Sequence, residues 1–241
     1  RYEQYGLEPK TILQQWDVAR NSEATYFDAN GVLQTAGINE PRIDYDPATG
    51  ECRGLLVEGQ STNLILWSEA FSGNWWVPGS NLVSNATISP DYTGNATKLV
   101  EANGTSDHRT YQIISGNTFS IFLKTAERSK CKVTTYTGSD HIGVTVDLSA
   151  GIITAVDAGV DGYGISDVGG GWYRVFINTA GYSYKCVWLL DDAGSNRYAG
   201  DGTSGIYIWG AQLEQADKPS SYIKTEASAV TRVAGIITPT V

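Results

Sequence analysis

Methionine is absent from this sequence of 241 residues, and histidine and cysteine are scarce. The two histidines, His108 and His141, are too few for a three-histidine zinc site or for a His-Glu-x-x-His helix. The cysteines, Cys52, Cys131 and Cys186, are odd in number and far apart, which suits synthesis in a reducing cytosol better than a secreted disulfide scaffold. We therefore expect unpaired cysteines packed as small apolar residues.

Positive charge and long apolar runs are also in short supply. Lysine and arginine number 17 against 26 aspartates and glutamates, which gives a net charge of −9 at pH 7. A surface that follows nucleic-acid phosphates normally has the opposite sign, so we expect no nucleic-acid partner. No apolar run approaches the roughly 18 residues that cross a bilayer, so we expect no membrane association either. With 41% hydrophobic residues the chain can still bury a substantial core.

Known catalytic and cofactor motifs are missing as well. The glycines of residues 162–171 form no dinucleotide-binding fingerprint, and no Gly-Lys-Ser/Thr occurs for a phosphate-binding loop. Structural calcium is conceivable at Asp44–Asp46 or Asp191–Asp192, but it is unsupported. After Asp44–Asp46, Ala48 and Thr49 occupy the positions where a calcium loop needs a ligand and a glycine. Asp191 and Asp192 are adjacent, and adjacent residues of a strand point to opposite faces. We therefore expect no catalytic residue, no metal and no cofactor.

Short alternating segments dominate from Ser61 onward. In Thr118–Lys124, the apolar residues Phe119, Ile121 and Leu123 fall on one face, as in a strand with one face in the core. Gly, Asn, Asp and Ser separate such segments as turn residues. The same pattern predicts further strands over residues 96–101, 109–114, 130–136, 142–148, 152–156, 172–178, 184–190 and 205–214. With almost no helix between them, these strands predict an all-β protein, a two-sheet antiparallel jelly-roll sandwich.

Three regions follow from these patterns. Residues 61–226 form the predicted jelly-roll domain, and residues 227–241 resemble an outgoing connector. Residues 1–60 contain Pro, Gly, Asn and Asp at close intervals, which predicts an extended N-terminal arm with turns. A short helix is predicted at 9–20, where apolar residues share one face after a proline. Such an arm cannot bury itself, so we expect it to pack along the sandwich or against other copies of the chain.

Aromatic residues supply the positive functional signal, with seven tryptophans and fourteen tyrosines. One face of a sugar ring packs on an aromatic ring while its hydroxyls need polar neighbours, so these residues favour a glycan site. Trp75 and Trp76 lie in a loop with glycine and asparagine, where one ring contacts ligand or, alternatively, closes the end of the sandwich or a subunit contact. The remaining candidates for glycan contact are Lys124, Tyr136, His141, Trp172, Arg174 and Tyr184.

Four of these candidates form a hypothetical patch. Tyr136, Lys124, Trp172 and Arg174 fall on the face of their strands that points away from the core, so they meet on one surface if their strands share a sheet. The alternative is that residues 1–60 or another subunit cover this second face. His141, in a predicted turn, is expected to face solvent, and His108 is expected to pack at a strand start.

Several longer segments resemble a family of bacteriophage tail-fibre and head-spike-fibre proteins. The resemblance rests on residues 20–31, 40–50, 54–64, the Gly-Trp-Tyr-Arg of 171–174, the Trp-Gly-Ala-Gln-Leu-Glu of 209–214, residues 220–225 and 231–232. It covers most of the chain. It implies a virion structural protein, made in the host cytoplasm, whose sandwich is similar to carbohydrate-binding modules and concanavalin-like lectins. It further implies a homotrimer on the virion tail or head, other virion proteins as partners, and no catalytic residues.

The leading hypothesis is therefore a fibre or spike domain that binds a host surface polysaccharide or glycan without catalysis. A purely structural capsid or tail joint is the first alternative, and it predicts that the Trp75–Trp76 loop is buried in a subunit interface. A polysaccharide-degrading enzyme is the second, and it predicts a carboxylate pair in a cleft with at least one raised pKa.

Overall fold

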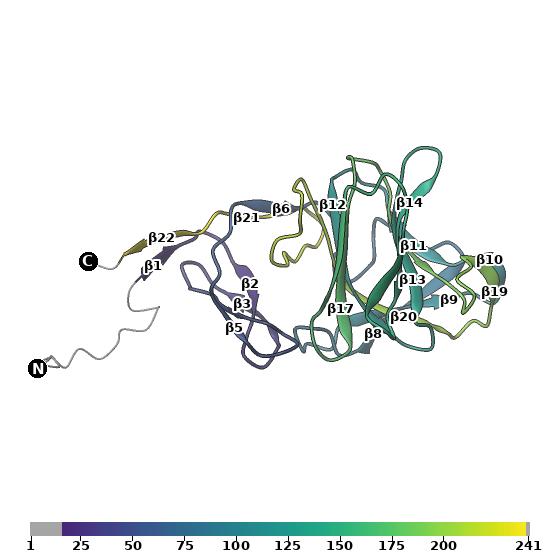
Figure 1. The fold of residues 1–241 in the computed structure, drawn as a ribbon, viewed down its shortest axis with the longest axis horizontal. Coiled ribbons are helices and arrows are strands. Elements are labelled where there is room, and N and C mark those ends of the chain that lie inside the picture. The colour runs from purple at the N-terminus through teal and green to yellow at the C-terminus, as the bar shows by residue number, and fades with distance from the viewer. Residues whose placement is uncertain (1–15, 240–241) are drawn as a thin grey trace, which may run out of the picture.

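The computed structural model describes residues 16–239, and it confirms the all-β prediction. Two six-stranded antiparallel sheets pack face to face as a sandwich (Figure 1). Sheet I contains, in spatial order, β15 (Ile152–Val156), β14 (His141–Asp147), β13 (Lys130–Tyr136), β18 (Lys185–Leu189), β11 (Arg109–Gln112) and β7 (Trp75–Trp76). Sheet II contains β16 (Gly162–Asp167), β17 (Trp172–Asn178), β12 (Thr118–Thr125), β20 (Gly205–Glu214), β9 (Ala96–Glu101) and β8 (Ser80–Thr87).

The core between the two sheets follows the alternation of the sequence. Phe119, Ile121 and Leu123 of β12 are fully buried and pack against residues such as Val187 and Leu189 of β18. Burying one such side chain stabilises the fold by about 1.5–3 kcal/mol relative to leaving it exposed. Cys131 is buried in this core, and Cys186 is also buried. Cys52 is exposed, contrary to the expectation that all three cysteines are buried. All three are free thiols.

Smaller two-stranded sheets extend the molecule beyond the sandwich. They pair β1 (Trp16–Ala19) with β22 (Ile236–Pro239), β2 (Ala24–Phe27) with β3 (Leu33–Ala36), β4 (Ile43–Tyr45) with β5 (Cys52–Leu55), β6 (Ser61–Asn63) with β21 (Val230–Arg232), and β10 (Gly104–Asp107) with β19 (Arg197–Gly200). We call residues 16–60 together with 227–239 the base. The segments of the base pair into two-stranded antiparallel sheets outside the two large sheets. Its C-terminal strand β22 lies antiparallel beside the N-terminal strand β1.

The helix expected at 9–20 does not form over the residues that can be compared. Residues 9–15 lie outside the described part of the chain, and β1 is a strand. β1 pairs antiparallel with β22, so that Val18 lies opposite Ile237. The local apolar spacing suits a helix, but hydrogen bonding to a strand more than 200 residues away decides the conformation.

The base covers the outer face of sheet II. Leu33 of the base packs with Phe122, Trp172, Trp209 and other buried side chains in a second apolar cluster on that face. Figure 1 shows β12 and β17 of sheet II toward the base and β13 and β14 of sheet I on the side away from it. The outer face of sheet I is therefore free of the base.

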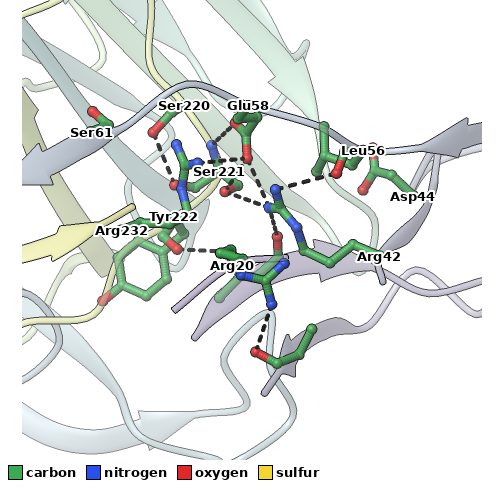
Figure 2. A network of polar contacts seen from close by, with 12 residues as sticks. Arg20, Arg42, Asp44, Leu56, Glu58, Ser61, Ser220, Ser221, Tyr222 and Arg232 are labelled. Carbon is green, nitrogen blue, oxygen red and sulfur yellow. Dashed lines mark hydrogen bonds and ion pairs between the residues drawn. The ribbon is translucent and has the colours of Figure 1, made fainter. Parts of the chain in front are cut away.

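A buried polar network fastens the base to the sandwich (Figure 2). The Glu58 carboxylate accepts hydrogen bonds from Arg42 Nη1 at 2.8 Å and from the Ser221 amide and hydroxyl at 2.8 and 2.7 Å. Arg232 Nη1 lies 3.6 Å from the same carboxylate, and both arginines are 1% exposed. Burial alone would raise the pKa of Glu58, but the Ser221 hydrogen bonds and the two arginines more than offset it and lower this pKa.

Candidate functional site

The structure places the two predicted tryptophans of β7 on opposite faces of sheet I. Trp75 belongs to the core, where its ring packs on Phe71 and its indole N–H donates to the Leu66 carbonyl at 3.0 Å. Trp76, the next residue of β7, points outward and is 59% exposed. The two neighbouring rings therefore have different environments, because adjacent strand residues point to opposite faces.

The patch that combined Tyr136 with Lys124, Trp172 and Arg174 does not form. Tyr136 lies in sheet I, whereas the other three lie in sheet II on the face toward the base. Trp172 is buried, and Lys124 donates from Nζ to the Gly170 carbonyl at 2.7 Å. Arg174 donates to the Ser220 carbonyl and the Ser120 hydroxyl at 2.8 and 3.0 Å. The hydrogen bonds of Lys124 and Arg174 stay within the sandwich, whereas Trp172 packs with Leu33 of the base. This agrees with the alternative in which residues 1–60 cover this face.

The other candidates gather on the outer face of sheet I with residues that the sequence did not single out. We call this cluster the aromatic face; it consists of Trp76, Arg109, Tyr111, Tyr136, His141, Tyr184 and Trp188. Tyr184 precedes β18, and the other members belong to β7, β11, β18, β13 and β14, which lie side by side in sheet I. The pairing places Tyr111 opposite both Trp76 and Cys186, and Tyr136 opposite His141.

The rings follow one another across the strands. Trp76 and Tyr111 are nearly parallel, with centroids 6.5 Å apart, and Tyr184 lies 5.2 Å from Tyr111. Tyr136 follows at 5.4 Å from Tyr184, and His141 at 4.9 Å from Tyr136. Neighbouring strands are about 4.8 Å apart, so this succession extends for roughly 20 Å across sheet I. All these spacings are within the range of favourable aromatic contacts.

Arg109 and Trp188 form the support beneath these rings. The Arg109 guanidinium lies 4.3 Å from the centre of the Trp188 ring and 5.5 Å from that of Tyr111. Trp188 is only 4% exposed, and its indole N–H donates to the Thr134 hydroxyl at 3.0 Å. Because Trp188 is fixed by burial and a hydrogen bond, it holds the arginine and His141 in place.

His141 is half-buried in this cluster and does not face solvent freely, contrary to expectation. Its ring packs edge-on against Trp188, with centroids 4.9 Å apart. Burial and the nearby Arg109 charge lower the pKa of His141 to about 4. Arg109 Nη1 lies 3.4 Å from His141 Nε2, and because arginine can only donate, Nε2 is the acceptor and the ring is neutral at pH 7.

Sequence reasoning missed Arg109, Tyr111 and the position of Trp188. Residues 109–112 are Arg-Thr-Tyr-Gln, in which apolar and polar residues do not alternate, so the local sequence contains no signal that Thr110 and Gln112 are buried and that Arg109 and Tyr111 point outward. Trp188 is buried on the outer face of sheet I, beside Thr134 and Arg109. His108 is fully buried before β11, as expected, where Nε2 contacts the Tyr198 carbonyl at 3.1 Å.

The described residues contain no cluster of metal-ligating side chains, and none of their carboxyl groups has a resolved rise in pKa. Among residues 16–239, no three His, Cys, Asp or Glu side chains are placed to hold a metal ion. In the Asp44–Asp46 segment, Asp46 accepts the amides of Ala48 and Thr49 at 2.9 and 3.0 Å, which is an ordinary Asx turn. No helix of this region is long and apolar enough to cross a membrane. Every carboxyl group in it with a resolved change has a lowered pKa: Asp28, Asp46, Glu58, Glu101, Glu127, Asp147 and Asp201.

No protein-family model matches this chain, and no curated protein matches it significantly.

Proposed function

We propose that the protein attaches a virion to its host by binding surface glycan on the aromatic face, without catalysis. The observation that carries this proposal is a succession of aromatic rings, uncovered by the base, across neighbouring strands of sheet I. An extended glycan places the C–H faces of successive sugars on such rings. The length of the succession suits a chain of several sugars better than a single one.

The electrostatics of the aromatic face favour an uncharged or weakly charged glycan. Arg109 can donate to sugar hydroxyls, and the neutral His141 adds no second positive charge at pH 7. The nearby cations are already paired, Lys132 with Asp157 at 2.8 Å and Arg197 with Asp107 at 3.4 Å. The net charge of −9 also disfavours binding of strongly anionic polysaccharides, because like charges repel.

The assignment to a virion rests on the resemblance to phage tail-fibre and head-spike-fibre proteins. That resemblance also supports a homotrimer that contacts other virion proteins. Light scattering at micromolar concentration is expected to give three times the 26.0 kDa mass of the chain. A monomer mass at that concentration would contradict the trimer.

The binding test uses immobilised bacterial surface polysaccharides of varied structure and measures association by biolayer interferometry. Trp76→Ala removes the most exposed ring of the aromatic face, and Tyr163→Ala removes a comparably exposed ring (51%) from the edge strand β16 of sheet II. We expect saturable binding to at least one polysaccharide, weakened about thirtyfold by Trp76→Ala, which corresponds to about 2 kcal/mol. Tyr163→Ala should bind as the natural protein does.

Other outcomes favour the alternatives. If no polysaccharide binds and Trp76 is protected from solvent quenching in the oligomer, the protein is a structural joint whose aromatic face is an interface. Such an interface would agree with the exposure of Trp76 and of nearby Ile113, which is 52% exposed. If new reducing ends appear during incubation with a polysaccharide, the protein is an enzyme, although no carboxyl group of residues 16–239 shows the raised pKa that an acid catalyst needs.

A further inference from the structure

An amine, a carboxamide and a carboxylate meet on the side of the sandwich where β8 is the edge strand, away from the aromatic face. They belong to Lys224, between β20 and β21, to Asn95, just before β9, and to Glu69, in the loop after β6. Glu69 Oε2 accepts a hydrogen bond from Asn95 Nδ2 at 2.9 Å and lies 2.8 Å from Lys224 Nζ. A single carboxylate oxygen thus bridges the amine and the carboxamide.

The carboxylate of Glu69 is fixed in a largely buried position. Glu69 is 7% exposed, and its other oxygen, Oε1, accepts a hydrogen bond from Tyr222 Oη at 3.2 Å. Tyr222 is buried and also contacts the Ser68 hydroxyl at 2.7 Å. Burial raises the pKa of Tyr222 well above its usual value, so its hydroxyl keeps the proton that it donates. Oε2 is therefore the oxygen that can exchange protons with Lys224 and Asn95.

The carboxamide of Asn95 is oriented by a buried tryptophan. Trp209 is 0% exposed, and its indole N–H donates to Asn95 Oδ1 at 2.7 Å. Because an indole nitrogen can only donate, this contact places the Asn95 oxygen toward Trp209 and its nitrogen toward Glu69. A donor aimed at a carbonyl oxygen stabilises the negative charge that forms there when a nucleophile attacks the carbon. Asn95 is thus held as an electrophile.

Lys224 supplies the nucleophile. Burial lowers the pKa of its amine, but the hydrogen bond and the charge of Glu69 outweigh this effect and raise the pKa, so the amine is protonated at neutral pH. Transfer of one proton to Glu69 Oε2 gives the neutral amine that a nucleophile needs. The Lys224 side chain is 57% exposed, so its stem is free to bring Nζ to the roughly 3–3.5 Å from Asn95 Cγ at which attack occurs.

We propose that Lys224 and Asn95 join in an intramolecular isopeptide bond, with Glu69 as the proton carrier. Lys224 Nζ attacks Asn95 Cγ, and the negative charge of the tetrahedral intermediate lies on Oδ1 beside Trp209. Glu69 Oε2 transfers two protons, one after the other, from Nζ to Nδ2. When the carbonyl forms again, the Cγ–Nδ2 bond breaks and the nitrogen leaves as ammonium. The Nζ–Cγ amide remains, and the step consumes no oxidant or other co-reactant.

The surroundings of the three side chains suit this reaction. All three line one cavity of about 190 Å³, which gives the ammonium room to leave. The new bond would link the start of β9 to the segment before β21 and so close a long loop of the chain. Closing a long loop restricts the unfolded chain, so the linked protein should unfold at a higher urea concentration than the unlinked one.

Intact mass spectrometry of the full chain tests the proposal. The natural protein should lose the mass of one ammonia molecule, and proteolysis should release a peptide containing Asn95 joined to one containing Lys224. Glu69→Gln keeps the shape of the side chain but cannot carry the proton, and Lys224→Arg keeps the positive charge without the amine. Both variants should keep the full sequence mass, with circular dichroism as the check that they fold. Lys98→Arg, in the ion pair with Glu127 at 2.6 Å, is the matched control and should form the bond.

A competing reaction has the same change of mass. An asparagine also loses ammonia when it closes on its own backbone as a succinimide, but hydroxylamine cleaves a succinimide and leaves an isopeptide bond intact. The proposal is overturned if the natural protein keeps its full sequence mass, if the loss persists in Lys224→Arg, or if Glu69→Gln loses ammonia as fast as the natural protein. Lys224→Arg should leave polysaccharide binding on the aromatic face unchanged, so this proposal and the proposed function can fail separately.

Discussion

The buried amine of Lys185 should make the protein less stable at neutral pH than in mild alkali. Lys185 is 0% exposed on the core side of β18, where its ammonium donates only to the Thr135 hydroxyl, at 3.1 Å. No carboxylate of residues 16–239 forms an ion pair with it. Burial lowers the pKa of Lys185 from 10.5 to about 8.

The size and sign of the effect follow from this difference. At about 1.4 kcal/mol per pH unit, the span from 10.5 to about 8 corresponds to about 3 kcal/mol. Below pH 8 both the folded and the unfolded chain hold the proton, so the folded state bears the whole cost of burying the charge. Between pH 8 and 10.5 the folded state loses the proton first, and the free energy of unfolding rises with pH. Above 10.5 the cost has disappeared.

Lys185→Met tests this reasoning. The variant should be more stable than the natural protein by up to about 3 kcal/mol at pH 7, and the advantage should shrink to nothing above pH 10.5. Thr135 stays satisfied, because its hydroxyl donates to the Ser183 carbonyl at 3.2 Å. Urea unfolding followed by tryptophan fluorescence from pH 7 to 11 measures the difference, and Lys218→Met, at an exposed lysine, is the control. A variant that is less stable at pH 7, or an advantage that does not change with pH, would refute the reasoning.

Two further predictions concern the base and the aromatic face. Glu58→Gln removes the counter-charge of Arg42 and Arg232 and should loosen the base by about 3–5 kcal/mol, seen as faster trypsin cleavage within residues 16–60 while the near-ultraviolet dichroism of the sandwich persists. Since the pKa of Glu58 is lowered, acid should have the same effect in the natural protein but little in the variant. Because the pKa of His141 is lowered from 6.5 to about 4, this residue does not reduce the free energy of unfolding above pH 6.5. Between pH 6.5 and about 4 the unfolded chain takes up the proton first, so the free energy of unfolding falls as the pH drops. His141→Phe should lose less stability over that range in thermal melts, and an equal loss would contradict the assignment.

Periodicity predicted the sandwich because its central strands bury one face each. The bounds of β13, β15, β17 and β20 agree with the predicted segments, and the phase of β12 is correct. The edge strands β8 and β16 were missed, since neither alternates clearly. β16 contains glycines, and at Gly164 a side chain would approach the Phe176 ring to 2.5 Å, so packing and not propensity explains the residue.

The candidate site was only partly predictable, because sheet membership depends on long-range pairing. Trp76 and Tyr184 could be found from their local context, and Tyr136 from its phase. Nothing in the local sequence reveals that Tyr136 shares a sheet with Tyr111, since β18 joins their strands from more than 45 residues away. The covering of Trp172 likewise depends on Leu33 of the base, far earlier in the chain. Which face of a sheet stays open is therefore decided by tertiary packing and cannot be read from alternation alone.

The pairing of β1 with β22 has a mechanical consequence. These strands run antiparallel and side by side at the end of the base farthest from sheet I, so residues 16 and 239 are neighbours (Figure 1). Tension applied between these two positions would open the ribbon like a zipper, one hydrogen-bonded pair after another, before any force reached the sandwich. The sandwich therefore lies outside the path along which force is transmitted between these two positions. Force applied there would leave the geometry of the aromatic face unchanged.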